Sequence, residues 1–201
     1  IMDGTLYFVE SRNERARNRE SGRIRIDHFC ESDTYLVALD IESGEKRWEH
    51  PVTFPFQHIF YLNGAEGVLL ASGSYNLEDK VFYGLYAFDA ANGEPKWDST
   101  FRARDIRCTG YADLGGTHGE QWQHPVLMQG TAYARPYAFD LHTGEQKDYH
   151  LYRGGHGCGG LTGSEHYLYG RGGNPRMYPI DIAKTEGIQI TEVSRPGCWL
   201  N

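Results

Sequence analysis

One short sequence pattern recurs along the chain at nearly equal intervals, and no other feature constrains the fold as much. The pattern reads Ala-x-Asp-x-x-x-Gly-Glu, and its copies lie within residues 35–48, 84–97 and 135–148. Successive aspartates are 49 and 51 residues apart, and a degenerate fourth copy near residues 177–182 keeps Asp181. The repeated positions are Ala38, Asp40, Gly44 and Trp48, then Ala87, Asp89, Gly93 and Trp97, and then Ala138, Asp140 and Gly144. Three copies at this spacing predict a repeat fold rather than unrelated hairpins.

Each copy has the composition of a β-hairpin. Alternation at Tyr35, Val37 and Leu39 favours a strand, whose successive side chains point to opposite faces. The aspartate that follows accepts hydrogen bonds from turn amides, and the glycine supplies the positive φ that closes the turn. Trp48 and Trp97 stand at the same place in their copies, which indicates packing between neighbouring units.

Further strand-like segments between the copies complete a four-stranded unit. They are residues 4–9, 58–62, 67–71 and 125–128, and we expect a turn containing Asn63-Gly64 to join the middle two. A period near 50 residues, with several strands and no amphipathic helix, predicts an all-β fold. Specifically, it predicts a β-propeller of four-stranded antiparallel blades, with about four blades represented.

Composition narrows the range of functions. The 201 residues include 27 acidic and 20 basic side chains, and the net charge of −7 argues against a nucleic-acid partner. No aliphatic run is long enough to form a transmembrane segment. The chain has no Gly-x-Ser-x-Gly, P-loop or EF-hand pattern, so nothing supports serine hydrolysis, NTP hydrolysis or EF-hand calcium binding.

The full pattern, Ala-x-Asp-x-x-[Thr/Ser/Asn]-Gly-x-x-x-Trp, resembles the repeat of PQQ-like, or quinoprotein-type, β-propellers. It is complete at residues 38–48 and 87–97, whereas Asp148 stands where the third copy would have its tryptophan. Such propellers usually close with seven or eight blades. The resemblance therefore implies that residues 1–201 are a partial propeller from a longer chain. The tail, residues 157–159 and 195–199, is similar to segments of large uncharacterised bacterial secreted proteins with this propeller.

The resembled family includes PQQ-dependent alcohol and sugar dehydrogenases, outer-membrane assembly lipoproteins and secreted propellers that serve as binding platforms. Its dehydrogenases carry adjacent cysteines and a calcium-binding Glu/Asn/Asp set, but the four cysteines of this chain are all isolated. The resemblance thus favours a non-catalytic scaffold, or a ligand- or protein-interaction module, of a larger exported bacterial protein. Its partners would be other blades or domains of that chain or a separate protein, in the periplasm or outside the cell.

Two alternative functions remain open. The first is a fragment of a PQQ- and calcium-dependent alcohol or sugar dehydrogenase, and the second is a carbohydrate- or metal-binding propeller domain. Because PQQ-like propellers are mostly exported to oxidising compartments, the resemblance is compatible with a disulfide between Cys158 and Cys198 in the last unit. The alternative is that both remain free thiols. Cys30 and Cys108 are either partners or free buried thiols.

The segment of residues 117–124 carries the greatest concentration of chemically active side chains. His118, Glu120 and His124 are of the types that bind metal ions, although their spacing matches no established metal-binding pattern. In a propeller, His124 would begin an innermost strand near the central channel, and Arg153 and His156 come at the corresponding place one unit later. These five residues are candidates for a polar pocket on the channel face. The alternative is a polar loop whose histidines bond to backbone carbonyls.

An arginine-rich segment lies near the start of the chain. Residues 10–25 contain six arginines and three glutamates, and their local charge of +3 contrasts with the negative charge of the whole. The segment has no helical or strand periodicity, so we expect a long solvated loop between strands. The alternative is an arm that docks on an anionic surface, such as a partner protein or an acidic polysaccharide.

Overall fold

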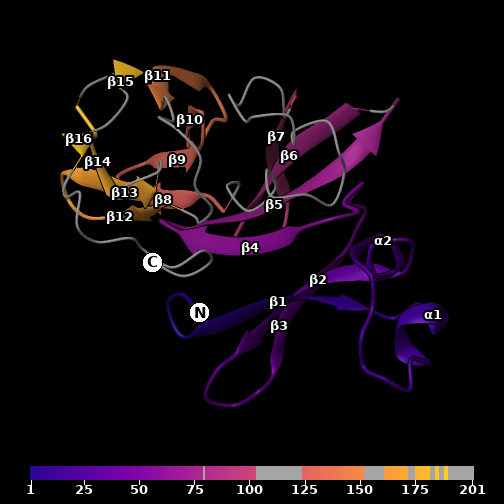
Figure 1. The fold of residues 1–201 in the computed structure, drawn as a ribbon. Coiled ribbons are helices and arrows are strands. Elements are labelled where there is room, and N and C mark those ends of the chain that lie inside the picture. Colours follow the sequence, from indigo (N-terminus) through magenta and orange to yellow (C-terminus); the bar gives the residue numbers. More distant parts are fainter. Residues whose placement is uncertain are drawn as a thin grey trace.

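The structure is a computed structural model that describes residues 1–78, 80–102, 124–151, 161–171, 175–181, 184–185 and 188–189. Within these residues the chain forms four consecutive β-sheets, together with two short helices in the first (Figure 1). Strands that follow one another in sequence pair antiparallel within each sheet. Each sheet is therefore a propeller blade, and the prediction of an all-β propeller fold is confirmed.

The first two blades hold the first two complete copies of the repeat. Blade 1 has three strands and two helices, which are β1 (Thr5–Ser11), α1 (Glu14–Arg17), α2 (Ile26–Phe29), β2 (Thr34–Asp40) and β3 (Lys46–Val52). Blade 2 has four strands, which are β4 (Phe60–Ala65), β5 (Val68–Leu77), β6 (Lys80–Asp89) and β7 (Pro95–Arg102).

The other two blades hold the third copy and the degenerate copy. Blade 3 comprises β8 (Val126–Met128), β9 (Thr131–Ala134), β10 (Tyr137–Asp140), β11 (Gln146–Leu151) and β15 (Lys184–Thr185). Blade 4 comprises β12 (Thr162–Gly163), β13 (Tyr167–Arg171), β14 (Pro175–Pro179) and β16 (Ile188–Gln189). The strand β15 pairs parallel to β11, so one strand that follows the degenerate copy in sequence extends the sheet of the preceding blade.

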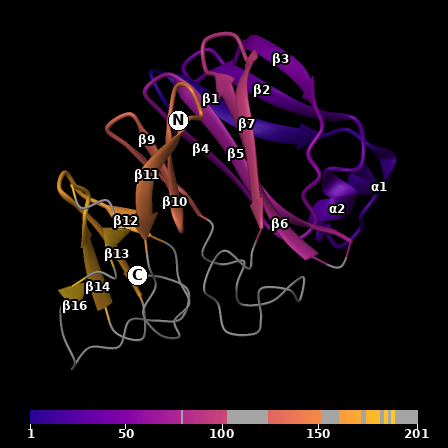
Figure 2. The ribbon, with the colours of Figure 1, turned by 90° about the horizontal axis from the view of Figure 1, so that it is seen from above.

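The blades follow one another side by side (Figure 2). The first strands of blades 2, 3 and 4 are neighbours, since β4 contacts β8 and β8 contacts β12. A blade between two neighbours is buried on both faces, which explains why Leu69 and Leu70 are each 1% exposed or less although their side chains point in opposite directions. Leu69 packs in the cluster between blades 1 and 2, and Leu70 in the cluster between blades 2 and 3. Burial of each such leucine contributes about 2 kcal/mol to the free energy of unfolding.

The hairpin turn that joins the first two strands of blade 2 differs from the expectation. It lies at Glu66-Gly67, where both residues have positive φ, and Asn63-Gly64 belong to strand β4. Asp3-Gly4 and Gln129-Gly130 have the same backbone conformation at the corresponding places in blades 1 and 3. Two successive positive φ angles match the twist of paired strands, and glycine relieves the strain at the second position.

Candidate functional site

The three complete Asp-to-Gly turns share one local geometry. The Asp40 carboxylate accepts hydrogen bonds from the amides of Glu42 and Ser43, at 3.0 and 2.9 Å. The carboxylate of Asp140 does the same for the two amides that follow it in blade 3, at 3.0 and 2.9 Å, and that of Asp89 accepts one amide in blade 2, at 2.8 Å. In blade 1, the Arg47 side chain and then the Ser43 amide hold the pKa of Asp40 well below its usual range. Each turn is therefore tied down by its aspartate.

The glycine of each later turn receives the tryptophan of the preceding blade. The Trp48 indole N–H donates to the carbonyl of Ala90 at 3.2 Å, and that of Trp97 donates to the carbonyl of Leu141 at 2.9 Å. A Cβ atom added to Gly93 would lie 2.7 Å from the Trp48 ring, and one added to Gly144 would lie 2.6 Å from the Trp97 ring. Glycine is therefore required at these two turns both for its positive φ and for the space that the indole occupies.

The boundary between blades 3 and 4 is built differently. Three residues of β11, Lys147 to Tyr149, face Ala138, whereas two residues face the matching alanine in each earlier blade. Within this bulge Asp148, which aligns with the tryptophan of the earlier copies, is exposed, and Tyr149 is the buried residue. Tyr149 is 8% exposed, and its hydroxyl donates to the carbonyl of Pro179 in the next blade at 3.0 Å. Burial raises the pKa of this phenol well above its usual range.

A pocket remains at this boundary beside Tyr149. It has a volume of about 250 Å³, and its blade 3 side is lined by Tyr133, Ala138 and Tyr149 together with the polar Thr131, Lys147 and Asp148. Ile180 and Asp181, which end the β14 segment, line the blade 4 side. At the preceding boundary the corresponding space is filled by Trp97, whose ring stacks on Phe139 with the two centroids 6.5 Å apart. The pocket thus marks the blade boundary that has no indole.

Only one of the five predicted channel-face residues lies among the described residues. His124 precedes β8 and packs edge-on against Tyr61 of β4, with the ring centroids 4.7 Å apart. Its burial lowers the pKa of the imidazole. His118, Glu120, Arg153 and His156 lie outside the described residues, so the predicted polar pocket remains a prediction.

The usual metal-donor side chains do not cluster among the described residues. Over the ranges that the structure describes, no group of three or more histidine, cysteine, aspartate or glutamate side chains is close enough to hold a metal ion. Cys30 is a buried free thiol, 5% exposed, and burial raises its pKa to about 11. The predicted pair Cys158 and Cys198, and also Cys108, lie outside the described residues.

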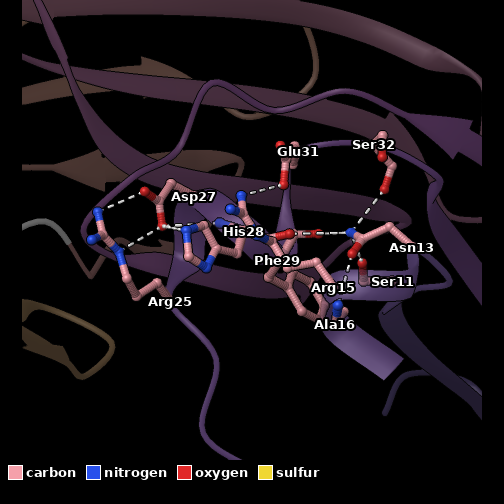
Figure 3. Close-up of polar contacts among 10 residues, drawn as sticks. All are labelled: Ser11, Asn13, Arg15, Ala16, Arg25, Asp27, His28, Phe29, Glu31 and Ser32. Atoms are coloured by element: carbon pink, nitrogen blue, oxygen red, sulfur yellow. Dashed lines mark hydrogen bonds and ion pairs between the residues drawn. The ribbon is translucent and has the colours of Figure 1, made fainter. Parts of the chain in front are cut away.

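The arginine-rich segment lies between β1 and β2 and is largely exposed, as expected of a solvated loop, and it also contains two single-turn helices. The insertion, residues 12–33, contains α1 and α2 and is organised by Asn13 (Figure 3). The Asn13 carboxamide is the N-cap of α1, accepting from the Ala16 amide at 2.8 Å. Its amide group donates to the Ser11 hydroxyl at 2.7 Å and to the carbonyls of His28 and Ser32, each at 3.1 Å.

Ion pairs within blade 1 compensate much of the insertion's positive charge. Arg12 bonds to Glu10 and Glu49, at 2.8 and 2.7 Å, while two exposed pairs join Arg15 to Glu31 and Arg25 to Asp27. Over residues 10–33 six arginines are matched by six carboxylates, because three of these acids follow residue 25. The segment therefore has no excess of arginines over carboxylates, and the excess was the basis for interpreting it as a basic docking arm.

Two features of the structure, the residue buried at the boundary between blades 3 and 4 and the anchor of the insertion, could not be located from the sequence pattern. The pattern aligned Asp148 with the tryptophan position, and the adjacent Tyr149 became the boundary residue only through the extra residue of β11. The signal for the insertion's anchor was equally weak, since Asn13 is one polar residue in a polar segment.

No helix among the described residues is long and apolar enough to cross a membrane.

Comparison with known proteins gives a similarity at the level of the propeller repeat. No protein-family model matches the chain. Among curated proteins, it is 27% identical over 112 residues to the outer membrane protein assembly factor BamB of Burkholderia pseudomallei (strain K96243). This stretch is 55% of the chain and 26% of that relative, so the chain spans about a quarter of the relative's length. The crystal structure of BamB from Moraxella catarrhalis matches with a TM-score of 0.42 and 18% identity, over 75% of this chain and 45% of that one. The chain is thus similar in sequence to an assembly factor whose length it covers only in part.

Proposed function

We propose that this chain is part of a non-catalytic β-propeller that serves as a protein-interaction scaffold of a larger exported bacterial protein. The proposed location is the periplasm or the outside of the cell. The observation that carries the proposal is the 27% identity to an outer membrane protein assembly factor over 112 residues. The proposal includes no resident PQQ or calcium.

The blade architecture supports an interaction role. The indoles of Trp48 and Trp97 join blade to blade, so the sheet faces between blades serve cohesion. The exposed turns and the insertion of residues 12–33 are then the surfaces that a partner meets. Such surfaces carry function when a rigid scaffold positions them, and Asn13 gives the insertion that rigidity.

Site-specific photo-crosslinking in cells tests this proposal on the protein in its native length. A photoreactive residue is placed at exposed Arg19 of the insertion and, in a second strain, at exposed Glu42 of the blade 1 turn. We expect cross-links to one defined protein from at least one of these positions. Purified protein that binds PQQ and calcium and oxidises alcohols or sugars in a dye-linked assay would overturn the proposal, as would a lack of cross-links from both positions.

A further inference from the structure

The pocket between blades 3 and 4 stands at the position where the other described boundaries hold an indole. At those boundaries Trp48 and Trp97 each bury their ring against a glycine of the next blade and donate to one of its carbonyls. Blade 3 instead has Asp148 at the aligned position and Tyr149 opposite Ala138. The phenol reaches the carbonyl of Pro179, but a volume of about 250 Å³ beside it stays open.

The walls of this pocket suit an aromatic ring. Tyr133 and Tyr149, which are 6% and 8% exposed, meet edge to face with their centroids 5.4 Å apart. Ile180 directly precedes Asp181, as Phe139 directly precedes Asp140 in blade 3. Phe139 stacks on the ring of Trp97, and Ile180 is a smaller apolar side chain at the equivalent position. These aromatic and aliphatic side chains suit one face of a planar ring, while Thr131, Lys147, Asp148 and Asp181 make the rest of the lining polar.

The charge at the pocket's mouth indicates what should flank that ring. The Lys147 ammonium is held by the Thr131 hydroxyl at 2.6 Å and lies 3.9 Å from the carboxylate of Asp140. The carboxylate of Asp181 lines the pocket and is exposed. A positively charged residue next to the bound ring therefore meets a complementary charge, whereas an acidic residue meets a like charge.

We propose that this pocket binds a tryptophan side chain presented by a peptide segment of a partner protein. The partner thereby supplies in trans the indole that the first two blades supply from their own strands. This inference names the kind of partner contact that the interaction scaffold makes, and it rests on that proposed function. The occupant is a peptide tryptophan, because the same chain places the same side chain at its two equivalent boundaries.

Fluorine NMR on the whole chain tests the proposal with defined probes. The first probe is a capped Lys-Trp-Lys tripeptide that carries 5-fluorotryptophan, and the second has glutamates in place of the lysines. We expect the lysine probe to bind with a dissociation constant of about 1 mM or tighter, and the glutamate probe to bind several-fold more weakly. A third probe, 5-fluoroindole alone, separates a small-molecule site from a peptide site.

Two substitutions fill the pocket from within. In Asp148→Trp the chain supplies its own indole, and Ile180→Phe restores the ring that blade 3 has at Phe139. We expect either variant to weaken binding of the lysine probe at least tenfold, while Glu42→Trp, which adds an indole on an exposed turn of blade 1, leaves binding unchanged. A thermal midpoint at or above that of the wild type shows that a filled variant has folded.

Several results would overturn the inference. They are undetectable binding of the lysine probe to the wild type, equal binding to the wild type and a folded filled variant, or tighter binding of 5-fluoroindole than of the peptide. If the probes fail to bind while photo-crosslinking to a partner persists, the pocket inference is wrong and the scaffold proposal stands. If cross-linking fails while the pocket binds the lysine probe selectively, the scaffold proposal is the one that falls.

Discussion

Replacing the glycine of a repeat turn with alanine separates its two roles, because the turns differ in what surrounds them. Gly44 and Gly144 have nearly the same backbone conformation, with φ of 72° and 75°. A Cβ atom on Gly44 meets nothing within 4 Å, whereas one on Gly144 lies 2.6 Å from the ring of Trp97. The pair Gly44→Ala and Gly144→Ala therefore isolates the cost of displacing the docked indole.

The magnitudes follow from these two terms. Alanine in the left-handed region costs about 1–2 kcal/mol, and both variants incur that cost. Gly144→Ala adds an overpacked contact with the rigid indole, which costs about 1–3 kcal/mol more. We therefore expect Gly44→Ala to lower the free energy of unfolding by about 1–2 kcal/mol, and Gly144→Ala to lower it by roughly 2–5 kcal/mol.

Urea unfolding at fixed pH measures both values, with tryptophan fluorescence reporting on the indoles. Each kcal/mol should also lower the thermal midpoint by about 2–4 °C in a chain of this size. Gly93→Ala is a second crowded case, because its Cβ would lie 2.7 Å from the Trp48 ring and also 2.6 Å from the ring of His50. Equal losses for Gly44→Ala and Gly144→Ala would refute the argument that the glycine exists to receive the tryptophan.

Three further predictions concern other parts of the molecule. Asn13→Ala should loosen the insertion by about 1–2 kcal/mol, because it removes a helix cap and the hydrogen bonds to the part-buried carbonyls of His28 and Ser32; trypsin should then cleave the insertion faster, and exposed Asn18→Ala should leave the cleavage rate unchanged. Burial lowers the pKa of His124, so the unfolded chain takes up its proton at a higher pH than the folded chain. Stability should therefore decrease as the pH falls below about 6.5, and urea midpoints at pH 7.5 and 5.5 should differ less in His124→Phe; an unchanged difference would contradict this. Because burial raises the pKa of Cys30 to about 11, peptide mapping after alkylation at pH 8 should find Cys30 unmodified in the native protein and modified in urea, whereas rapid labelling of the native protein would contradict its burial.

The blades were predictable because three copies of the repeat contain the same residues for the same local hydrogen bonds. Asp40 and its equivalents satisfy turn amides within a few residues, so the sequence alone carries that information. The turn in blade 2 was placed wrongly because Asn63-Gly64 is a strong turn signal by composition. Its asparagine instead donates to the carbonyl of Pro125 at 2.8 Å, a contact 62 residues away that no local pattern contains.

The insertion and the third boundary depend on long-range pairing in the same way. Charge counted over residues 10–25 gave a basic segment, but Glu31 later in the insertion balances Arg15, and Glu49 balances Arg12 once β3 lies in the same sheet as β1. Tyr149 could not be recognised as a boundary residue, because β11 has one residue more opposite Ala138 than the earlier blades have at the matching place. The blades could therefore be predicted from local sequence, whereas the contacts between residues far apart in the chain could not.

The parallel pairing of β15 with β11 has a consequence for how the blades come apart. Apolar packing and the bond from the Trp48 indole join blades 1 and 2, whereas backbone hydrogen bonds tie a strand that follows the degenerate copy to blade 3. Blade 3 cannot release β15 without disturbing the connection through blade 4. Native-state hydrogen exchange should therefore show the amides of β11 and β14 opening together as one cooperative unit, while those of β2 open independently.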